Sequence, residues 1–261
     1  MKNGFYVFLA AFVALGGSWL GFVYGPVHQL GGAGETAVLN SADTYPLQRP
    51  GDATLGLQVY RANGCAACHT EQVRQTGTAC NVVLMDGGKN PVAVTNLISS
   101  LILTNLTKED ADKVSDKITA AGGKSETHII ATGPDITRGW GMRQGVAEDY
   151  LYDQPVQLGS LRAGPDLSNV GLRGDLNSQL IHLYAPQSAV KGSTMPPFRY
   201  LFVVRNRKTG DAPSPEALQF PKEFAPPDGY EIVPTPEVKQ LAAYLLSLRA
   251  NAPLYSAPIS P

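Results

Sequence analysis

Residues 64–69 hold the residue types that attach and ligate a haem. They read GCAACH, with Cys65 and Cys68 separated by two alanines and His69 directly after the second cysteine. Covalent haem c attachment uses this spacing. Two thiols add to the two vinyl groups of one porphyrin, and the adjacent histidine reaches the iron. The motif therefore predicts one covalent haem c, held by Cys65 and Cys68, with His69 as the proximal ligand.

Two other sites use the same residue types and stay open. A thioredoxin-like dithiol follows a strand in a βαβ unit, whereas the sequence predicts a helix before Cys65. A zinc site needs four ligands. Cys80 and a histidine would have to complete it, because the chain has no second pair of cysteines with this spacing. Haem is favoured over both.

The other face of the iron needs a ligand from a distant part of the chain. Met195 is favoured because two prolines follow it in GSTMPPF. They reduce the freedom of the loop and hence the cost of ordering a weak thioether ligand. Met142, beside a glycine, is the next choice, and His182 is expected to be a packed or capping residue. The other histidines and internal methionines are His28, His128 and Met85.

Composition narrows the class of protein. The 261 residues include 27 glycines and 20 prolines, an excess that predicts long ordered loops. The net charge is −1, and no basic block is present, so no nucleic-acid partner is expected. Three cysteines give no even disulfide framework. With two of them on a haem, Cys80 is expected to be a buried free thiol.

An N-terminal membrane anchor is predicted from residues 4–24. The run carries no charge, and as a helix it spans about 30 Å, the thickness of a bilayer's hydrocarbon core. Tyr6, Trp19 and Tyr24 suit the two membrane interfaces. The run is longer than a signal-peptide core, and no convincing cleavage site follows it closely. We therefore expect residues 1–25 to be a retained single span.

The elements that must position the motif are predicted mainly as helices. A helix over 52–63 leads into Cys65, and a short amphipathic helix is expected near 176–184. A third helix over 236–251 carries an apolar stripe of Val238, Leu241, Leu245 and Leu248. Loops fill most of 140–204, and the proline-rich stretch 205–235 is expected to wrap the surface.

Residues 76–138 have a different sequence pattern from the rest of the chain and predict a small α/β insert. Strands are expected at 81–85 and 126–132, and helices at 90–103 and 107–123, with Thr107 as the N-cap of the second helix. These signals are self-contained, so we expect the insert not to touch the iron. The predicted order is an anchor at 1–25, a linker at 26–51 and a haem domain at 52–261, interrupted by this insert.

Three stretches together resemble a known family. They are GCAACHTEQVR, YLYDQPVQLGSLRAGPDLSNVG and HLYAPQSAVKGSTMPPF. Their order resembles the membrane-anchored monohaem cytochrome c subunit (subunit II) of cbb3-type cytochrome c oxidases. The resemblance implies a mainly α fold with long loops, a class I cytochrome c-like haem domain behind one transmembrane helix. It implies that Met195 is the distal ligand and that Arg162 binds a haem propionate; a solvated arginine is the alternative for Arg162.

The resemblance also implies a function and a place. The chain would be a non-catalytic electron-transfer subunit of a respiratory haem–copper oxidase, between a cytochrome c donor and the catalytic subunit. Haem c is attached outside the bacterial cytoplasm, so the haem domain would lie on the periplasmic side of the inner membrane, bound to lipid and to other membrane subunits. The insert and the long proline-rich stretch depart from the family pattern. A free-standing tethered shuttle and a nitric oxide reductase subunit remain alternatives.

Overall fold

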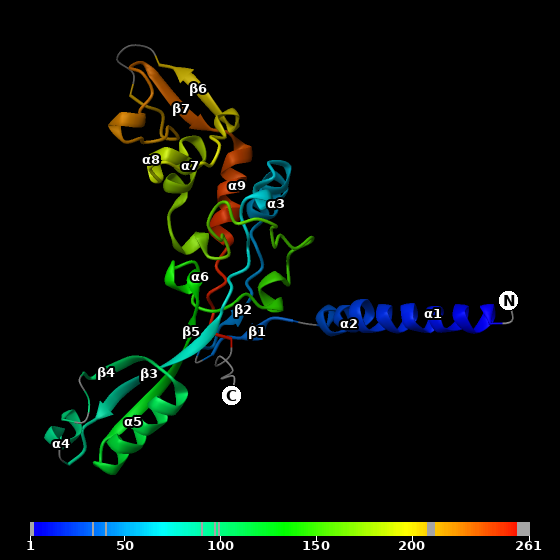
Figure 1. Ribbon diagram of the computed structural model, residues 1–261. Coiled ribbons are helices and arrows are strands. Elements are labelled where there is room, and N and C mark those ends of the chain that lie inside the picture. The colour runs from blue at the N-terminus through cyan, green and yellow to red at the C-terminus, as the bar shows by residue number, and fades with distance from the viewer. Residues whose placement is uncertain are drawn as a thin grey trace.

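The computed structural model describes residues 3–254 apart from 33, 40, 90, 97, 99 and 208–211. Its described part has three regions, which Figure 1 separates clearly. A long N-terminal helix projects to one side, a helical domain with long loops lies in the centre, and a small sheet with a helix extends away from it.

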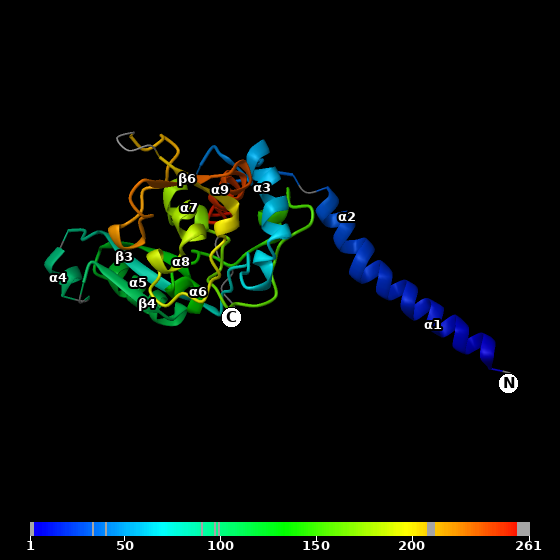
Figure 2. The same cartoon turned by 90° about the horizontal axis from the view of Figure 1, so that it is seen from above.

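The N-terminal helix has the dimensions of a membrane span. It comprises α1 (Gly4–Trp19), a π-helical turn (Leu20–Tyr24) and the start of α2 (Gly25–Gly31). The stretch Gly4–Gln29 is 26 residues long and apolar enough to cross a membrane by length and composition. Figure 2 shows it standing clear of the rest of the chain, and Phe8 and Phe22 are exposed on it. It is a candidate membrane anchor, and it continues past residue 25.

Residues after this helix are tied to the C-terminal part of the chain. The two short strands β1 (Thr36–Ala37) and β2 (Thr44–Tyr45) pair antiparallel. The amide of Leu39 donates to the carbonyl of Pro253 at 2.7 Å. The stretch predicted as a linker therefore packs against the domain that follows it.

Two helices form the centre of the haem domain. They are α3 (Gly51–Ala62), just before the cysteine motif, and α9 (Pro236–Ser247), near the C-terminus. Thr235 caps α9 by accepting from the amide of Val238, and Pro236 starts it, as suits the first turn of a helix. The predicted stripe of α9 is buried: Val238, Leu241, Leu245 and Leu248 are each at most 6% exposed.

Gly56 allows α3 and α9 to approach closely. A Cβ at Gly56 would lie 1.9 Å from the carbonyl oxygen of Gln240, a distance that no side chain can occupy. Tyr60 on α3 and Tyr244 on α9 are both fully buried, with ring centroids 5.2 Å apart. Close backbone contact and an aromatic pair thus hold α3, the helix that directly precedes the cysteine motif, against α9.

The rest of this domain is loops with short elements. α7 (Leu176–Tyr184) begins at its N-cap Asp175 and is followed by α8 (Pro186–Ala189). Single 3-10 turns span Cys65–Ala67, Ala147–Tyr150, Val170–Leu172, Arg199–Leu201 and Lys222–Phe224. The proline-rich stretch is bounded by the hairpin of β6 (Phe202–Asn206) and β7 (Tyr230–Pro234). The predicted loops and the short helix near 176–184 are confirmed.

The sheet region is built from residues between the haem motif and α6 (Pro134–Thr137). It contains β3 (Gly77–Asp86), α4 (Pro91–Thr95), β4 (Ile102–Leu106), α5 (Lys108–Ala120) and β5 (Lys124–Thr132). The antiparallel strand order is β4-β3-β5. Its own core holds Cys80, Val82, Val94, Ala111 and Ile118. Cys80 is a buried free thiol, as predicted.

The predicted helix over 90–103 is wrong in its second half. α4 ends at Thr95, and Ile102 and Leu103 belong to β4, where they pair with Val83 and Val82. Apolar periodicity cannot distinguish a buried helix from a strand over so short a run. Pairing with β3 decided the outcome, because it satisfies backbone hydrogen bonds of β4, while Leu103 and Leu106 pack, partly buried, against the core of the sheet region.

Gly56→Ala should destabilise the haem domain by about 1–3 kcal/mol, the usual cost of overpacking a core. The added methyl group would force α3 away from α9 at the carbonyl of Gln240. Urea unfolding of the purified protein measures the effect. Gly51→Ala is the matched control, because a Cβ there meets nothing within 4 Å. Equal midpoints for both variants would contradict the prediction.

Candidate haem site

The cysteine motif forms a tight turn directly after α3. Gly64 has φ +66°, a left-handed conformation that glycine adopts without strain. The amides of Cys68 and His69 both donate to the carbonyl of Cys65, at 3.1 and 3.0 Å. Cys65 is half-buried and Cys68 is exposed, and both are free thiols. The turn therefore places two thiols and one imidazole within a single turn of chain.

His69 is oriented by a segment far along the sequence. Its Nδ1 lies 2.8 Å from the carbonyl oxygen of Pro165. A carbonyl only accepts, so Nδ1 carries the proton and Nε2 keeps the lone pair with which it can bind a metal. Burial lowers the pKa of His69, which favours the neutral, ligating form.

Backbone contacts hold this segment against the motif. Gly164 donates to the carbonyl of Cys68 at 2.9 Å, and Leu167 donates to the carbonyl of Thr70 at 2.7 Å. Gly164 also lies against the imidazole, because a Cβ there would be 2.3 Å from Cε1 of His69. The absence of a side chain at Gly164 thus gives the ring of His69 its space.

A cavity of about 320 Å³ opens beside His69, within the usual size of ligand pockets. It brings Met195 together with Cys65 and His69, which lie more than a hundred positions earlier in the sequence. The remaining lining residues are Tyr60, Pro165, Leu167, Val170, Arg173, Ser178, Gln179, His182, Leu183, Ala189, Val190, Leu241 and Leu245. Most of the wall is apolar, as a porphyrin face requires.

These residues fit a haem c. The cavity has on its walls an imidazole and a thioether, the donor set of a Met/His-ligated haem iron, and the thiol of Cys65, which can attach to the porphyrin. Gly164 leaves room for the imidazole. Among the described residues, no cluster of three or more His, Cys, Asp or Glu side chains could hold a metal ion, so nothing in that part of the chain favours the zinc alternative.

The cavity separates the candidates for the distal ligand. Met195 and His182 both line it. Met85 and Met142 are 62% and 72% exposed and lie outside it. His128 is on β5 near Glu126, and His28 is on α2. His182 was expected to be a packed or capping residue; burial and then the nearby His69 lower its pKa. Met195 as the distal ligand stays a prediction.

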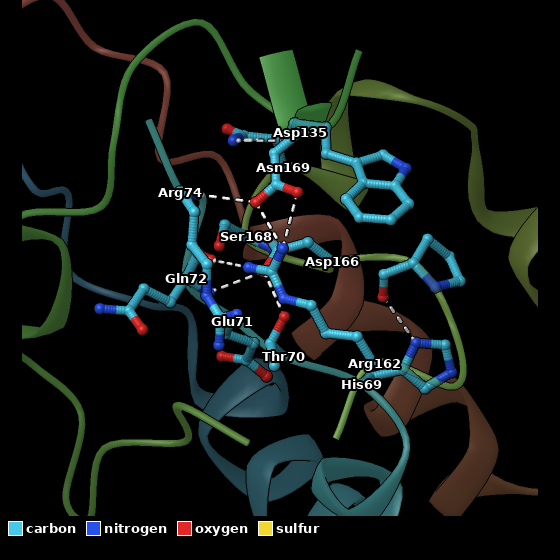
Figure 3. A network of polar contacts seen from close by, with 12 residues as sticks. His69, Thr70, Glu71, Gln72, Arg74, Asp135, Arg162, Asp166, Ser168 and Asn169 are labelled. Atoms are coloured by element: carbon cyan, nitrogen blue, oxygen red, sulfur yellow. Dashed lines mark hydrogen bonds and ion pairs between the residues drawn. The ribbon is translucent and has the colours of Figure 1, made fainter. Parts of the chain in front are cut away.

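Arg162 does not line the cavity, and its guanidinium binds other protein groups. It donates from Nη1 to both carboxylate oxygens of Asp135, at 2.6 and 2.5 Å, and from Nη2 to the carbonyl of Gln72 at 2.5 Å. Figure 3 shows the guanidinium pointing toward these groups and away from the His69 ring. Its Nε is buried and has no hydrogen-bond partner in the described residues. The propionate role of Arg162 stays a prediction.

The sequence reasoning missed Arg173. This arginine lines the cavity, and its Nη2 donates to the carbonyl of Asp166 at 2.5 Å. Its remaining donors make no other hydrogen bond in the described part of the chain. A signal existed: Arg173 follows the stretch RAGPDLSNVG, which already contains the partner of His69. A cation held at the edge of an apolar cavity suits a carboxylate group of the bound ligand.

The sequence reasoning also missed a buried carboxyl group behind the motif. Glu71 is 2% exposed, and both its oxygens accept from the hydroxyl of Tyr244, at 2.9 Å. Burial raises the pKa of Glu71 to about 8, against the lowering effect of the Tyr244 hydrogen bond. Nothing in the sequence marks this glutamate as buried, because the tyrosine that covers it lies on α9.

Part of the chain matches a known protein family. Residues 131–219 match the family described as cytochrome c oxidase, mono-haem subunit/FixO. The resemblance to the monohaem subunit of cbb3-type oxidases is confirmed. The matched segment contains Arg162, Arg173 and Met195, whereas the cysteine motif precedes it. FixO proteins are haem-containing cytochromes, which supports a haem and a cytochrome c-like domain here. No curated protein matches the chain.

Gly164→Ala should disturb the imidazole of His69. The new Cβ would lie 2.3 Å from Cε1, so the ring must turn and weaken its hydrogen bond to Pro165. We expect overpacking of about 1–3 kcal/mol and a changed visible spectrum of the haem-loaded protein. Gly51→Ala serves as the control, since its Cβ meets nothing within 4 Å. An unchanged spectrum and unfolding midpoint in the Gly164 variant would show that the ring is not confined there.

Proposed function

We propose that this chain carries one covalent haem c and passes electrons from a cytochrome c donor to the catalytic haem–copper subunit of a cbb3-type oxidase. The FixO family implies an electron-transfer subunit of such an oxidase. The observation that carries the proposal is the cavity that brings Cys65, His69 and Met195 together. The donor and the route into the catalytic subunit are part of the proposal.

The cysteine motif and several residues of the cavity have roles in this proposal. Cys65 and Cys68 would hold the haem through thioether bonds, and Nε2 of His69 and the sulfur of Met195 would bind its iron. When bound, the haem supplies one-electron transfer at its iron. Leu167, Val170, Leu183, Leu241 and Leu245 exclude water from the cavity. Arg173 and the free Nε of Arg162 are candidates to hold the propionates.

The chain itself is proposed to be non-catalytic. In the described residues, the buried carboxyl groups of Glu71, Asp135 and Asp166 each bind a protein donor. Oxygen chemistry would therefore belong to the partner subunit. What this chain contributes is the placement of the haem and the surroundings that set its potential.

The membrane arrangement follows from the same proposal. Residues 1–25 would cross the bacterial inner membrane with the N-terminus inside, 26–51 would connect, and the haem domain at 52–261, with its insert at 76–138, would lie in the periplasm. A Cβ at Gly17 or Gly21 would meet nothing within 4 Å. These small residues allow close packing of another transmembrane helix, which favours a subunit of a complex over a free-standing shuttle.

A pyridine haemochrome assay should give one covalent haem per chain, because the sequence has one motif of this kind. Cys65→Ser and Cys68→Ser should each weaken or abolish attachment, since each removes one thioether bond. Cys80→Ser is the matched control, because Cys80 is buried in the sheet region. Two haems per chain, or none, would disprove the proposed cofactor.

Met195 should determine the spectrum and potential of the haem. Met195→His should lower the potential, because imidazole donates more strongly to ferric iron than a thioether does. Met195→Ala should abolish the weak red charge-transfer band that is typical of methionine–iron bonding. Met142→Ala, at an exposed position outside the cavity, should leave that band unchanged. If the band survives Met195→Ala, Met195 is not the ligand.

A further inference from the structure

Asp135 belongs to the insert by sequence but reaches the haem domain with its side chain. It lies on α6, three residues after the end of β5, and inside the predicted range 76–138. The residue is 3% exposed. Besides both bonds from Arg162, its Oδ2 accepts from the amide of Arg74 at 2.8 Å. Burial alone would raise the pKa of Asp135, but the hydrogen bonds from Arg162 and Arg74 lower it.

The pair of Asp135 and Arg162 joins three stretches of chain. Arg162 also binds the carbonyl of Gln72, and its Nη2 lies 3.6 Å from the carboxylate of Asp166. Asp166 is fully buried and accepts from the hydroxyl of Thr70 at 2.6 Å and from the amide of Gln72 at 2.8 Å. Figure 3 shows this cluster next to His69. It fastens α6, the residues after the haem motif and the start of the segment 162–168 to one another.

Pro165 lies between the two fastened residues of that segment. Arg162 is held by Asp135, and Asp166 is held by Thr70 and Gln72. The carbonyl of Pro165, which His69 contacts at 2.8 Å, has little freedom as a result. We propose that Asp135 is a positioning residue of the haem site, acting through Arg162 to keep the Pro165 carbonyl on Nδ1 of His69.

The direction in which the haem potential shifts distinguishes a loss of positioning from a direct effect of the removed charge. The hydrogen bond from Nδ1 makes the imidazole a stronger donor to ferric iron, so weakening it raises the potential. Loss of positioning therefore raises the potential whether Asp135 or Arg162 is changed. A charge effect alone gives opposite signs. Removing the Asp135 carboxylate disfavours the ferric state and raises the potential, whereas removing the Arg162 cation lowers it.

The test is redox titration of the full-length, haem-loaded protein with Asp135→Asn, Arg162→Gln and both changes together. We expect both single variants to raise the potential. The double variant should shift no further than the larger single shift, because both act through one contact. A lowered potential in Arg162→Gln, or shifts that simply add in the double variant, would overturn the proposal.

Two further variants serve as controls. Asp149→Asn removes another buried carboxylate, one that pairs with Arg143 at 2.7 Å, and should leave the potential unchanged. Asp135→Glu keeps the charge but lengthens the side chain, so it should still raise the potential. If Asp135→Asn cannot be recovered with haem, the potential of Asp135→Glu becomes the test. An unshifted potential in Asp135→Glu would overturn the proposal.

The proposal also implies that residues 78–131 of the insert can be removed without affecting the haem site, whereas Asp135 cannot. Residues Gly77 and Thr132 are paired neighbours, so replacing 78–131 with a short Gly/Ser linker keeps Asp135 and should leave the potential unchanged. The same replacement carrying Asp135→Asn should raise it. If the replacement alone shifts the potential as much as the combined variant, Asp135 is not the contact that matters.

This inference rests on the proposed haem site, and the two fail differently. Wild-type protein without covalent haem would disprove the proposed function. Haem-loaded variants whose potentials shift in opposite directions would disprove only the role of Asp135.

Discussion

The hydrogen bond between Nδ1 of His69 and the carbonyl of Pro165 joins residues 96 positions apart, and the haem site depends on it. It selects the imidazole nitrogen that is free to bind iron. The backbone bonds of Gly164 and Leu167 to the motif hold the same two stretches in parallel contact.

The sheet region interrupts the two stretches that must meet, and its geometry explains why this is tolerated. Its first and last strands, β3 and β5, pair along their length, so the chain leaves and returns at neighbouring positions. The amide of Thr76 donates to the carbonyl of Thr132 at 2.9 Å. Its own small core, centred on Ile118 and Val82, supports the sheet without drawing on the core of the haem domain.

Three aspartates with buried side chains in the described residues each form an ion pair with an arginine. Asp135 is neutralised by Arg162, Asp153 by Arg49 and Asp149 by Arg143. An uncompensated buried charge is costly, so removing one partner of such a pair destabilises more than the pair itself stabilises. Glu71 differs, because burial raises its pKa to about 8 and Tyr244 supplies a neutral donor. These contacts give the loops a fixed arrangement that regular secondary structure does not provide.

The sequence by itself determined the local features: the spacing of Cys65, Cys68 and His69, the apolar N-terminal run and the apolar stripe of helix α9. Each depends on residues close together in the chain. Only the tertiary structure decided that residues 102–106 form the strand β4 and not the end of the predicted helix, because they pair with β3. It also revealed Arg173 in the cavity and the pairing of Arg162 with Asp135. Such contacts join segments that are far apart in the chain. They depend on the packing of the whole domain, so no local sequence pattern predicts them.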